Sequence, residues 1–332
     1  MRRFLALAAF CASCAAAPNL APEQQAVIDH ISAASLRGHL SFIASDLLEG
    51  RATPSRGLDL AAEYIAAQFR RAGLEPAVGS DYFQTATLRA GKAKNVIGLL
   101  RGSDPVLKDT YIVVSAHYDH LGIRSIGEDR IYNGANDDGS GTVSVIEIAS
   151  ALAALPVHPK RSVLFVAFFG EEPGLLGSQY YAKHPLVPLE KTIAEINLEQ
   201  VGRTDTTNGP QVGVAYFTGF NYSDLGDILS HEASGAGFRI AAGASAKNED
   251  LFERSDNLPF AEMGIPDGTL YVAADFPDYH RVTDEWQKID YENMAKLDRA
   301  LALGLLRLAS DEPGPKWNST VPAARKFMHA PH

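Results

Sequence analysis

Apolar residues recur along the chain in two patterns, which predict alternating helices and strands. Helical spacing marks residues 32–48 and 59–72, and the second segment ends in two arginines and Gly73, as helices often do. Further helices are predicted at residues 140–155, 174–184, 222–234 and 291–309. Apolar runs bounded by turn residues predict strands at residues 95–100, 110–116, 161–169, 192–198 and 211–217.

This alternation favours an α/β domain, because strands separated by helices pair in parallel within one sheet. We expect a single domain over residues 18–310, with a central mixed, mostly parallel sheet flanked by helices. Residues 203–250 are richer in Gly, Ser, Thr and Asn and are expected to decorate that sheet. Residues 311–332 are expected to form a C-terminal tail, wrapped on the surface or mobile.

Composition excludes several classes of protein. The 332 residues are 46% hydrophobic, and 40 acidic against 30 basic residues give a formal net charge of -10. No cluster of Lys and Arg occurs beyond the first few positions, so we expect no nucleic-acid partner. The longest apolar stretch, residues 4–12, is far shorter than the roughly 20 residues of a transmembrane helix. We therefore expect no transmembrane segment.

The first 17 residues are typical of a secretory leader. Arg2 and Arg3 precede a short apolar run and a region of small residues, although a frayed N-terminal helix is the alternative. Both cysteines, Cys11 and Cys14, lie in this segment, so the folded domain has no disulfide and is stabilised by its core. Ser13-Cys14 weakly resembles a lipoprotein processing site. We expect an exported protein, periplasmic or secreted, with a lipid anchor at Cys14 as the alternative.

Acidic and imidazole side chains follow three of the predicted strands. His117 and Asp119 come after the strand that ends at residue 116, Glu171 and Glu172 after the strand 161–169, and Glu199 after the strand 192–198. The carboxyl ends of parallel strands share the sheet edge at which α/β proteins bind ligands. Gathered there, these carboxylates would repel one another unless a cation compensates them. The sequence therefore predicts a metal site.

Two further acidic features support this hypothesis. Residues 133–141 read Asn-Gly-Ala-Asn-Asp-Asp-Gly-Ser-Gly, a tight loop whose glycines let the backbone fold closely around a cation. The alternative is a helix cap, because Asp137, Asp138 and Ser140 are all good N-cap residues. The adjacent Glu171 and Glu172 follow an apolar run, which favours one as a metal ligand and the other as a proton shuttle.

Five motifs occur together in this order: Ser-Ala-His-Tyr-Asp at 115–119, Gly-Ala-Asn-Asp-Asp-Gly-Ser-Gly at 134–141, Phe-Gly-Glu-Glu-Pro-Gly-Leu-Leu-Gly-Ser at 169–178, Asn-Leu-Glu at 197–199 and Asp-Tyr-His at 278–280. With them the chain resembles the di-zinc exopeptidase family, which includes bacterial leucyl aminopeptidases, glutamate carboxypeptidases and glutaminyl cyclases. The resemblance covers residues 36–308 and includes Leu-Glu-Gly-Arg at 48–51.

The resemblance implies a ligand set for two zinc ions per chain. Asp137 would bridge the two ions. Glu172 and His280 would complete one site, and His117 and Glu199 the other. Nitrogen and carboxylate ligands without thiolate suit zinc, and other divalent metals such as cobalt or manganese would also fit.

The resemblance also implies catalytic roles. Glu171 would be the general base, and Asp119 would hydrogen-bond His117 and fix its tautomer. Tyr279 would donate a hydrogen bond to the tetrahedral oxyanion, with a packed ring as the alternative. The sequence does not favour a mechanism with a serine or cysteine nucleophile, because no Gly-x-Ser-x-Gly motif occurs and both cysteines lie in the leader.

The function implied is an exported, metal-dependent exopeptidase acting on peptide substrates, in the first place an aminopeptidase that hydrolyses N-terminal residues. A glutaminyl cyclase or a glutamate-type carboxypeptidase of the same fold is the alternative, followed by a binding module without catalysis. The sequence indicates no oligomeric state.

Two residues depart from the family pattern. Glu199 stands where Asp is more common, which lengthens one ligand by a methylene. Asn257 stands where relatives commonly have His, and the segment 254–257 is expected near the rim of the site, where this departure would affect substrate preference. For His120, a loop hydrogen bond is favoured over a third metal as the alternative.

Overall fold

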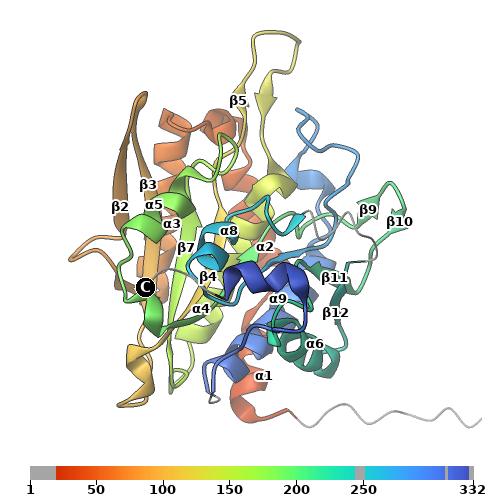
Figure 1. Cartoon of the computed structure of the whole chain (residues 1–332). Helices are drawn as coiled ribbons and strands as arrows, with labels where there is room; N and C mark the ends of the chain where they lie inside the picture. The colour runs from red at the N-terminus through yellow and green to blue at the C-terminus, as the bar shows by residue number, and fades with distance from the viewer. Residues whose placement is uncertain (1–19, 244–250, 311–312, 329–332) are drawn as a thin grey trace, which may run out of the picture.

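The computed structural model describes residues 20–243, 251–310 and 313–328. The predicted leader, with Cys11 and Cys14, lies outside these residues. Within them, one nine-stranded sheet runs through the molecule and carries helices on both faces (Figure 1). No helix of the described ranges combines the length and the apolar character needed to cross a bilayer.

The strand order of the sheet is β1-β3-β7-β4-β8-β13-β11-β12, and β2 pairs with β3. The strands are β1 (Glu75–Pro76), β2 (Phe83–Leu88), β3 (Gly91–Leu100), β4 (Tyr111–His117), β7 (Ser162–Phe168), β8 (Thr192–Leu198), β11 (Val214–Phe217), β12 (Arg239–Ala242) and β13 (Thr269–Tyr271). The central strands β7, β4, β8 and β13 are parallel, and antiparallel pairings with β3 and β11 flank them. The predicted mixed α/β sheet is confirmed, and its central strands share one carboxyl edge.

Residues 203–250 contribute to the sheet itself. We expected this region to decorate the sheet, but β11 and β12 extend it, pairing in parallel with each other, and β11 pairs antiparallel with β13. Strand β11 lies within the strand predicted at residues 211–217, whereas β12 and β13 have only four and three residues, too few to show a clear period, and were not predicted. Two small hairpins, β5 (Gly122–Ile123) with β6 (Ile131–Tyr132) and β9 (Asp205–Thr206) with β10 (Gly209–Pro210), lie outside the sheet.

Both faces of the central strands are buried. In β7, Val163, Phe165 and Ala167 face one core cluster, and Leu164, Val166 and Phe168 face another. This alternation explains the unbroken apolar run in the sequence, because every side chain of the strand is covered.

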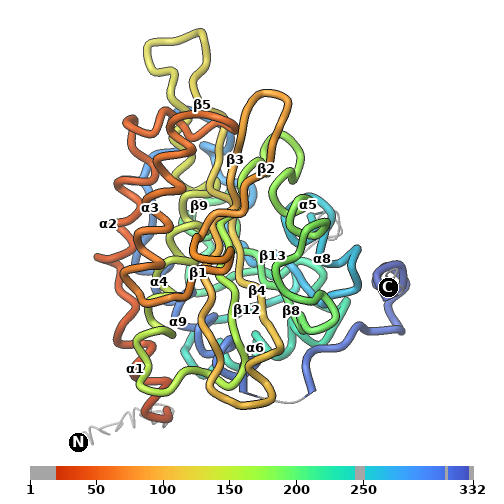
Figure 2. The backbone as a smooth tube through the Cα atoms, turned by 90° about the vertical axis from the view of Figure 1, so that its left-hand side faces the viewer, coloured from red at the N-terminus to blue at the C-terminus, as the bar shows by residue number. Residues whose placement is uncertain are grey.

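The helices form one layer on each side of the sheet (Figure 2). The larger layer contains α1 (Pro22–His30), α2 (Ala33–Ile43), α3 (Arg56–Ala72), α4 (Gly141–Ala153) and α9 (Tyr291–Leu308). The opposite layer contains α5 (Leu176–Lys183) and α8 (Leu258–Glu262). Helix α6 (Leu225–Gly235) packs against α9 and β12.

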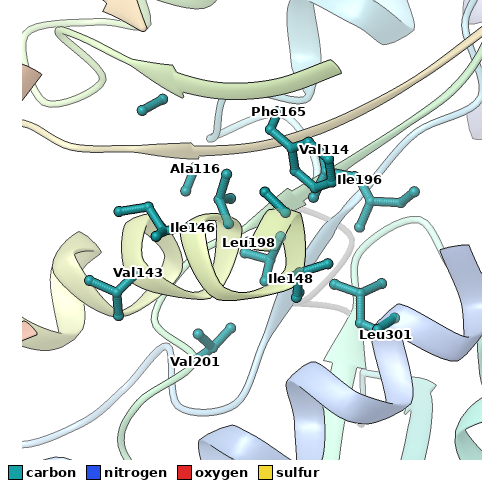
Figure 3. Close-up of a cluster of buried hydrophobic side chains, with 14 of the residues drawn as sticks. Val114, Ala116, Val143, Ile146, Ile148, Phe165, Ile196, Leu198, Val201 and Leu301 are labelled. Carbon is teal, nitrogen blue, oxygen red and sulfur yellow. The ribbon is translucent and has the colours of Figure 1, made fainter. Parts of the chain in front are cut away.

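Helix α4 fixes the start of the acidic loop. Its Val143, Ile146 and Ile148 pack with Val114 of β4 and Phe165 of β7 in the main core cluster (Figure 3). The helix is buried from Gly141 to Leu152. Since α4 begins where the segment Ala135–Ser140 ends, its tight packing holds that segment beside the carboxyl edge of the sheet.

The described part of the predicted C-terminal tail packs against the domain. It contains the short helix η6 (Pro322–Phe327), in which Ala324 and Phe327 are buried. The Phe327 ring lies 5.3 Å from that of Phe252, and Trp317 Nε1 donates a hydrogen bond of 2.8 Å to the carbonyl of Gly264. Residues 313–328 therefore add a small apolar cluster to the fold.

Candidate active site

The acidic and imidazole side chains that follow the central strands meet at the carboxyl edge, as predicted. His117 is the last residue of β4, Glu171 and Glu172 come shortly after β7, and Glu199 follows β8 directly. A pocket of about 260 Å³ opens at this edge. Its lining includes Asp137, Glu171, Glu172, Glu199, Tyr279 and His280.

Asp137 lies at the centre of the cluster. Its Oδ1 is 3.4 Å from Nε2 of His117, and its Oδ2 is 3.1 Å from Nε2 of His280. The same His280 atom is 3.2 Å from Oε2 of Glu172. On the other side, ligand atoms of His117, Asp137 and Glu199 lie within 4.8 Å of one another. The structure thus brings all five predicted ligands together, with Asp137 between the two groups.

Several of these buried atoms have no hydrogen-bond partner in the described part of the chain. They include His117 Nε2, Asp137 Oδ2 and Glu172 Oε1. Buried polar atoms are nearly always paired, so unpaired atoms that face one another indicate a site for an additional group. Imidazole and carboxylate donors without thiolate suit zinc. The donor set therefore fits a divalent cation on each side of Asp137.

The surroundings of the adjacent Glu171 and Glu172 shift their pKa values in opposite directions. Burial raises the pKa of Glu171 to about 10; the charge of His117 opposes this shift, and nearby carboxylates, Glu199 first, add to it. Burial also works against ionisation of Glu172, yet contacts with His120 and His280 lower its pKa to about 2. A carboxyl that binds a proton next to one that stays ionised is the arrangement expected of an acid–base residue beside a ligand.

Asp119 connects His117 to Glu171. The Nδ1 atom of His117 lies 3.3 Å from the backbone oxygen of Asp119 and 3.5 Å from its Oδ1. The Asp119 carboxylate also accepts hydrogen bonds of 3.1 Å from the backbone N–H of Glu171 and from the Thr53 hydroxyl. Asp119 lies next to His117 as predicted, and its second contact, with Glu171, was not foreseen.

Tyr279 stacks on a predicted ligand. Its ring lies 3.9 Å from that of His280, and 38% of the residue is exposed. It also lines the pocket. This position accommodates both predicted roles, a packed ring and a donor facing the substrate.

Two further carboxylates hold the acidic loop. Asp138 Oδ1 accepts hydrogen bonds from the backbone N–H groups of Gly141 (2.9 Å) and Gln200 (3.1 Å), so the helix-cap alternative applies to Asp138 while Asp137 faces the histidines. The peptide bond between Asp137 and Asp138 is cis. Asp284, which no sequence pattern singles out, accepts hydrogen bonds from the backbone N–H groups of Asn136 and Asp137.

Arg51 joins the loops that carry the ligands. Its guanidinium is fully buried and donates hydrogen bonds of 2.6–2.9 Å to four backbone carbonyls. The acceptors are the carbonyls of Ile43, Tyr118, Asn133 and Gly134. Burial lowers the pKa of Arg51 to about 10, although nearby aspartates, Asp119 first, oppose this effect. The motif at residues 48–51 thus has a structural role that its sequence did not disclose.

The segment 254–257 reaches the pocket as expected, because Arg254 and Ser255 line it. Asn257 itself is fully buried, donates a hydrogen bond to the carbonyl of Phe252 and accepts one from Thr269 Oγ1, so it packs behind the pocket.

His120 makes a loop hydrogen bond through its backbone N–H, which donates to the carbonyl of Arg51 (3.2 Å), and its ring contacts a predicted ligand. The residue is 2% exposed, and its Nε2 atom has no hydrogen-bond partner among the described residues. Its Nδ1 lies 2.6 Å from Glu172 Oε1, and ligand atoms of His120, Asp137 and Glu172 lie within 4.8 Å of one another. The contact depends on a residue from another strand end, which the local sequence does not indicate.

Comparison with known proteins adds a family match. The sequence model described as Peptidase family M28 matches residues 95–304. Aminopeptidase YwaD of Bacillus subtilis is 28% identical over 233 residues, which cover 68% of this chain and 46% of that protein. The chain spans about half the length of curated relatives that it matches.

Solved structures share the fold. The LapA aminopeptidase of Legionella pneumophila superposes with a TM-score of 0.69 at 20% identity, covering 87% of this chain and 75% of that one. The glutaminyl cyclase of Porphyromonas gingivalis superposes with a TM-score of 0.64 at 21% identity, covering 83% and 98%. At these identities the likeness establishes the fold, which an aminopeptidase and a cyclase share.

Replacing Arg51 tests whether it holds the ligand loops together. Arg51→Met leaves four carbonyls without their donor, and each buried unpaired acceptor costs about 1–3 kcal/mol. We expect the free energy of unfolding to fall by more than about 3 kcal/mol in urea denaturation. Arg56→Met, on an exposed side chain of α3, is the matched control. Equal stability of the two variants would contradict the role given to Arg51.

Proposed function

The chain belongs to peptidase family M28, and on this basis we propose that it is a zinc-dependent exopeptidase, in the first place an aminopeptidase that releases N-terminal residues from peptides. The observation that carries the proposal is the meeting of five ligand side chains around Asp137, four of which line one pocket together with Glu171. His117 and Glu199 would hold one zinc ion, Glu172 and His280 the other, and Asp137 both. Bound zinc supplies an activated water and polarises the scissile carbonyl.

Glu171 is the general base in this proposal. It lines the pocket beside the ligands, where it would accept a proton from the attacking water and pass it to the leaving amine. The hydrogen bond from its backbone N–H to Asp119 fixes the start of the segment that carries it. Asp119 thereby aligns the base with His117, which it also contacts.

The activities named for YwaD and LapA favour an aminopeptidase as the first candidate. One observation favours a carboxypeptidase as second candidate: Arg254 lines the pocket and offers a guanidinium to a substrate carboxylate. Arg203 is a weaker candidate for this role, because its guanidinium already donates hydrogen bonds to Asp205 and Asp278.

Export belongs to the proposal as well. It is supported by the two arginines, the apolar run and the small residues of positions 2–17, which are typical of a secretory leader. Residues 18–310 would then form the exported catalytic domain, and Cys14 would carry a lipid anchor if the leader is processed as in lipoproteins.

Hydrolysis of matched peptides tests the activity. The protein is stripped of metal, then restored with zinc, and is given peptides with free or blocked N-termini and free or amidated C-termini. We expect cleavage only with zinc and a free N-terminus. Cleavage that requires a free C-terminus would favour the carboxypeptidase. Absence of all cleavage, with cyclisation of an N-terminal Gln, would replace the proposal by a glutaminyl cyclase.

A variant of the base tests the mechanism. Glu171→Gln keeps the shape of the side chain but cannot accept the proton, so we expect kcat to fall by about 10²- to 10⁴-fold. Zinc content, measured by mass spectrometry of the metal, is expected to stay at the wild-type level. Glu190→Gln, an exposed glutamate on η4 (Leu189–Lys191), is the control. Unchanged turnover of Glu171→Gln would exclude this base.

A further inference from the structure

We propose that His120 is a ligand of the second zinc site, the one that includes Glu172 and His280. This inference rests on the proposed two-zinc function. It gives that site two histidines, while the site of His117 and Glu199 keeps one.

One nitrogen of the buried His120 ring has no partner, and the other faces a carboxylate. The residue is 2% exposed, and its Nε2 atom has no hydrogen-bond partner among the described residues. Its Nδ1 atom lies 2.6 Å from Glu172 Oε1. Leaving a buried nitrogen such as Nε2 unpaired is costly. A cation bound by the imidazole would satisfy it.

The surrounding donors converge on the same place. Ligand atoms of His120, Asp137 and Glu172 lie within 4.8 Å of one another. Glu172 contacts a histidine through each of its oxygens, His120 through Oε1 and His280 through Oε2. The rings of the two histidines are 5.6 Å apart in an edge-to-face arrangement. Two imidazoles and two carboxylates are a donor set that zinc favours.

The backbone is shaped to hold this ring. Gly134 has a φ of +54°, and a Cβ atom there would lie 2.5 Å from both Cγ and Cδ2 of His120. The backbone N–H of His120 donates a hydrogen bond of 3.2 Å to the carbonyl of Arg51, whose guanidinium binds the carbonyl of Gly134. The ring therefore sits in a space that requires glycine opposite it, and its position is fixed before a cation binds.

The two sites then differ in the number of protein ligands. The second would have His120, Asp137, Glu172 and His280, and the first would have His117, Asp137 and Glu199. Sites with four protein ligands are closed, whereas sites with three keep a position for water or substrate. We therefore expect the second zinc to be retained longer during dialysis, and the first site to carry the exchangeable position.

X-ray absorption at the zinc edge tests the inference, because outer-shell scattering from imidazole reports the histidines bound per zinc. With two zinc ions loaded, three histidines give about 1.5 imidazoles per zinc, and two histidines give about 1. We expect the higher value for the wild type and the lower value for His120→Ala. His231→Ala, on an exposed side chain of α6, is the control and should match the wild type.

A second variant isolates the site. In His117→Ala, zinc that remains bound occupies the second site, where we expect two imidazoles, falling to one in the variant that also carries His120→Ala. A single imidazole in His117→Ala, or about 1 imidazole per zinc in the wild type, would overturn the inference while leaving the two-zinc peptidase intact. Failure of the wild type to bind zinc at all would instead overturn the proposed function.

Discussion

Carboxylates crowded into one buried place are the constraint on which the rest of this structure depends. Asp137, Glu171, Glu172 and Glu199 line the same pocket, and burial opposes the charged form of each. Histidines on either side of Asp137 offset part of this charge, and His280, whose pKa rises to about 10 through its contacts with Asp137 and Glu172, carries part of the compensation. Cations between the ligands would supply the remainder.

Holding like charges together requires a rigid frame, and the fold provides it in two ways. The parallel strands deliver His117, the glutamate pair and Glu199 to one edge, because each side chain follows a strand that is buried on both faces. The connecting loops are then tied by buried polar groups. Arg51 binds carbonyls of the loops that carry His120 and Asp137, and Asp284 accepts a hydrogen bond from the backbone N–H of Asp137.

The part of this arrangement that the sequence predicted is the part set by local pattern. The apolar run of β7 indicated a strand that is covered on both faces, and the acidic residues that follow three such strands predicted a shared site. A strand as short as β13 has too few residues to show a period of alternating apolar and polar positions. The side-chain partners of Asn257 and His120 were not predicted for a different reason, since they come from other segments of the chain: Thr269 for one, and Glu172 for the other.

Anomalous diffraction at the zinc edge, on crystals of the zinc-loaded protein, tests the central claim most directly. If cations complete the cluster of carboxylates and histidines, two anomalous peaks lie in the pocket, one beside His117 and Glu199 and one beside Glu172 and His280, with the Asp137 carboxylate between them. A pocket without anomalous density, in crystals of protein that is active as a peptidase, would contradict the account. It would mean that these carboxylates are held together by protons and histidines alone.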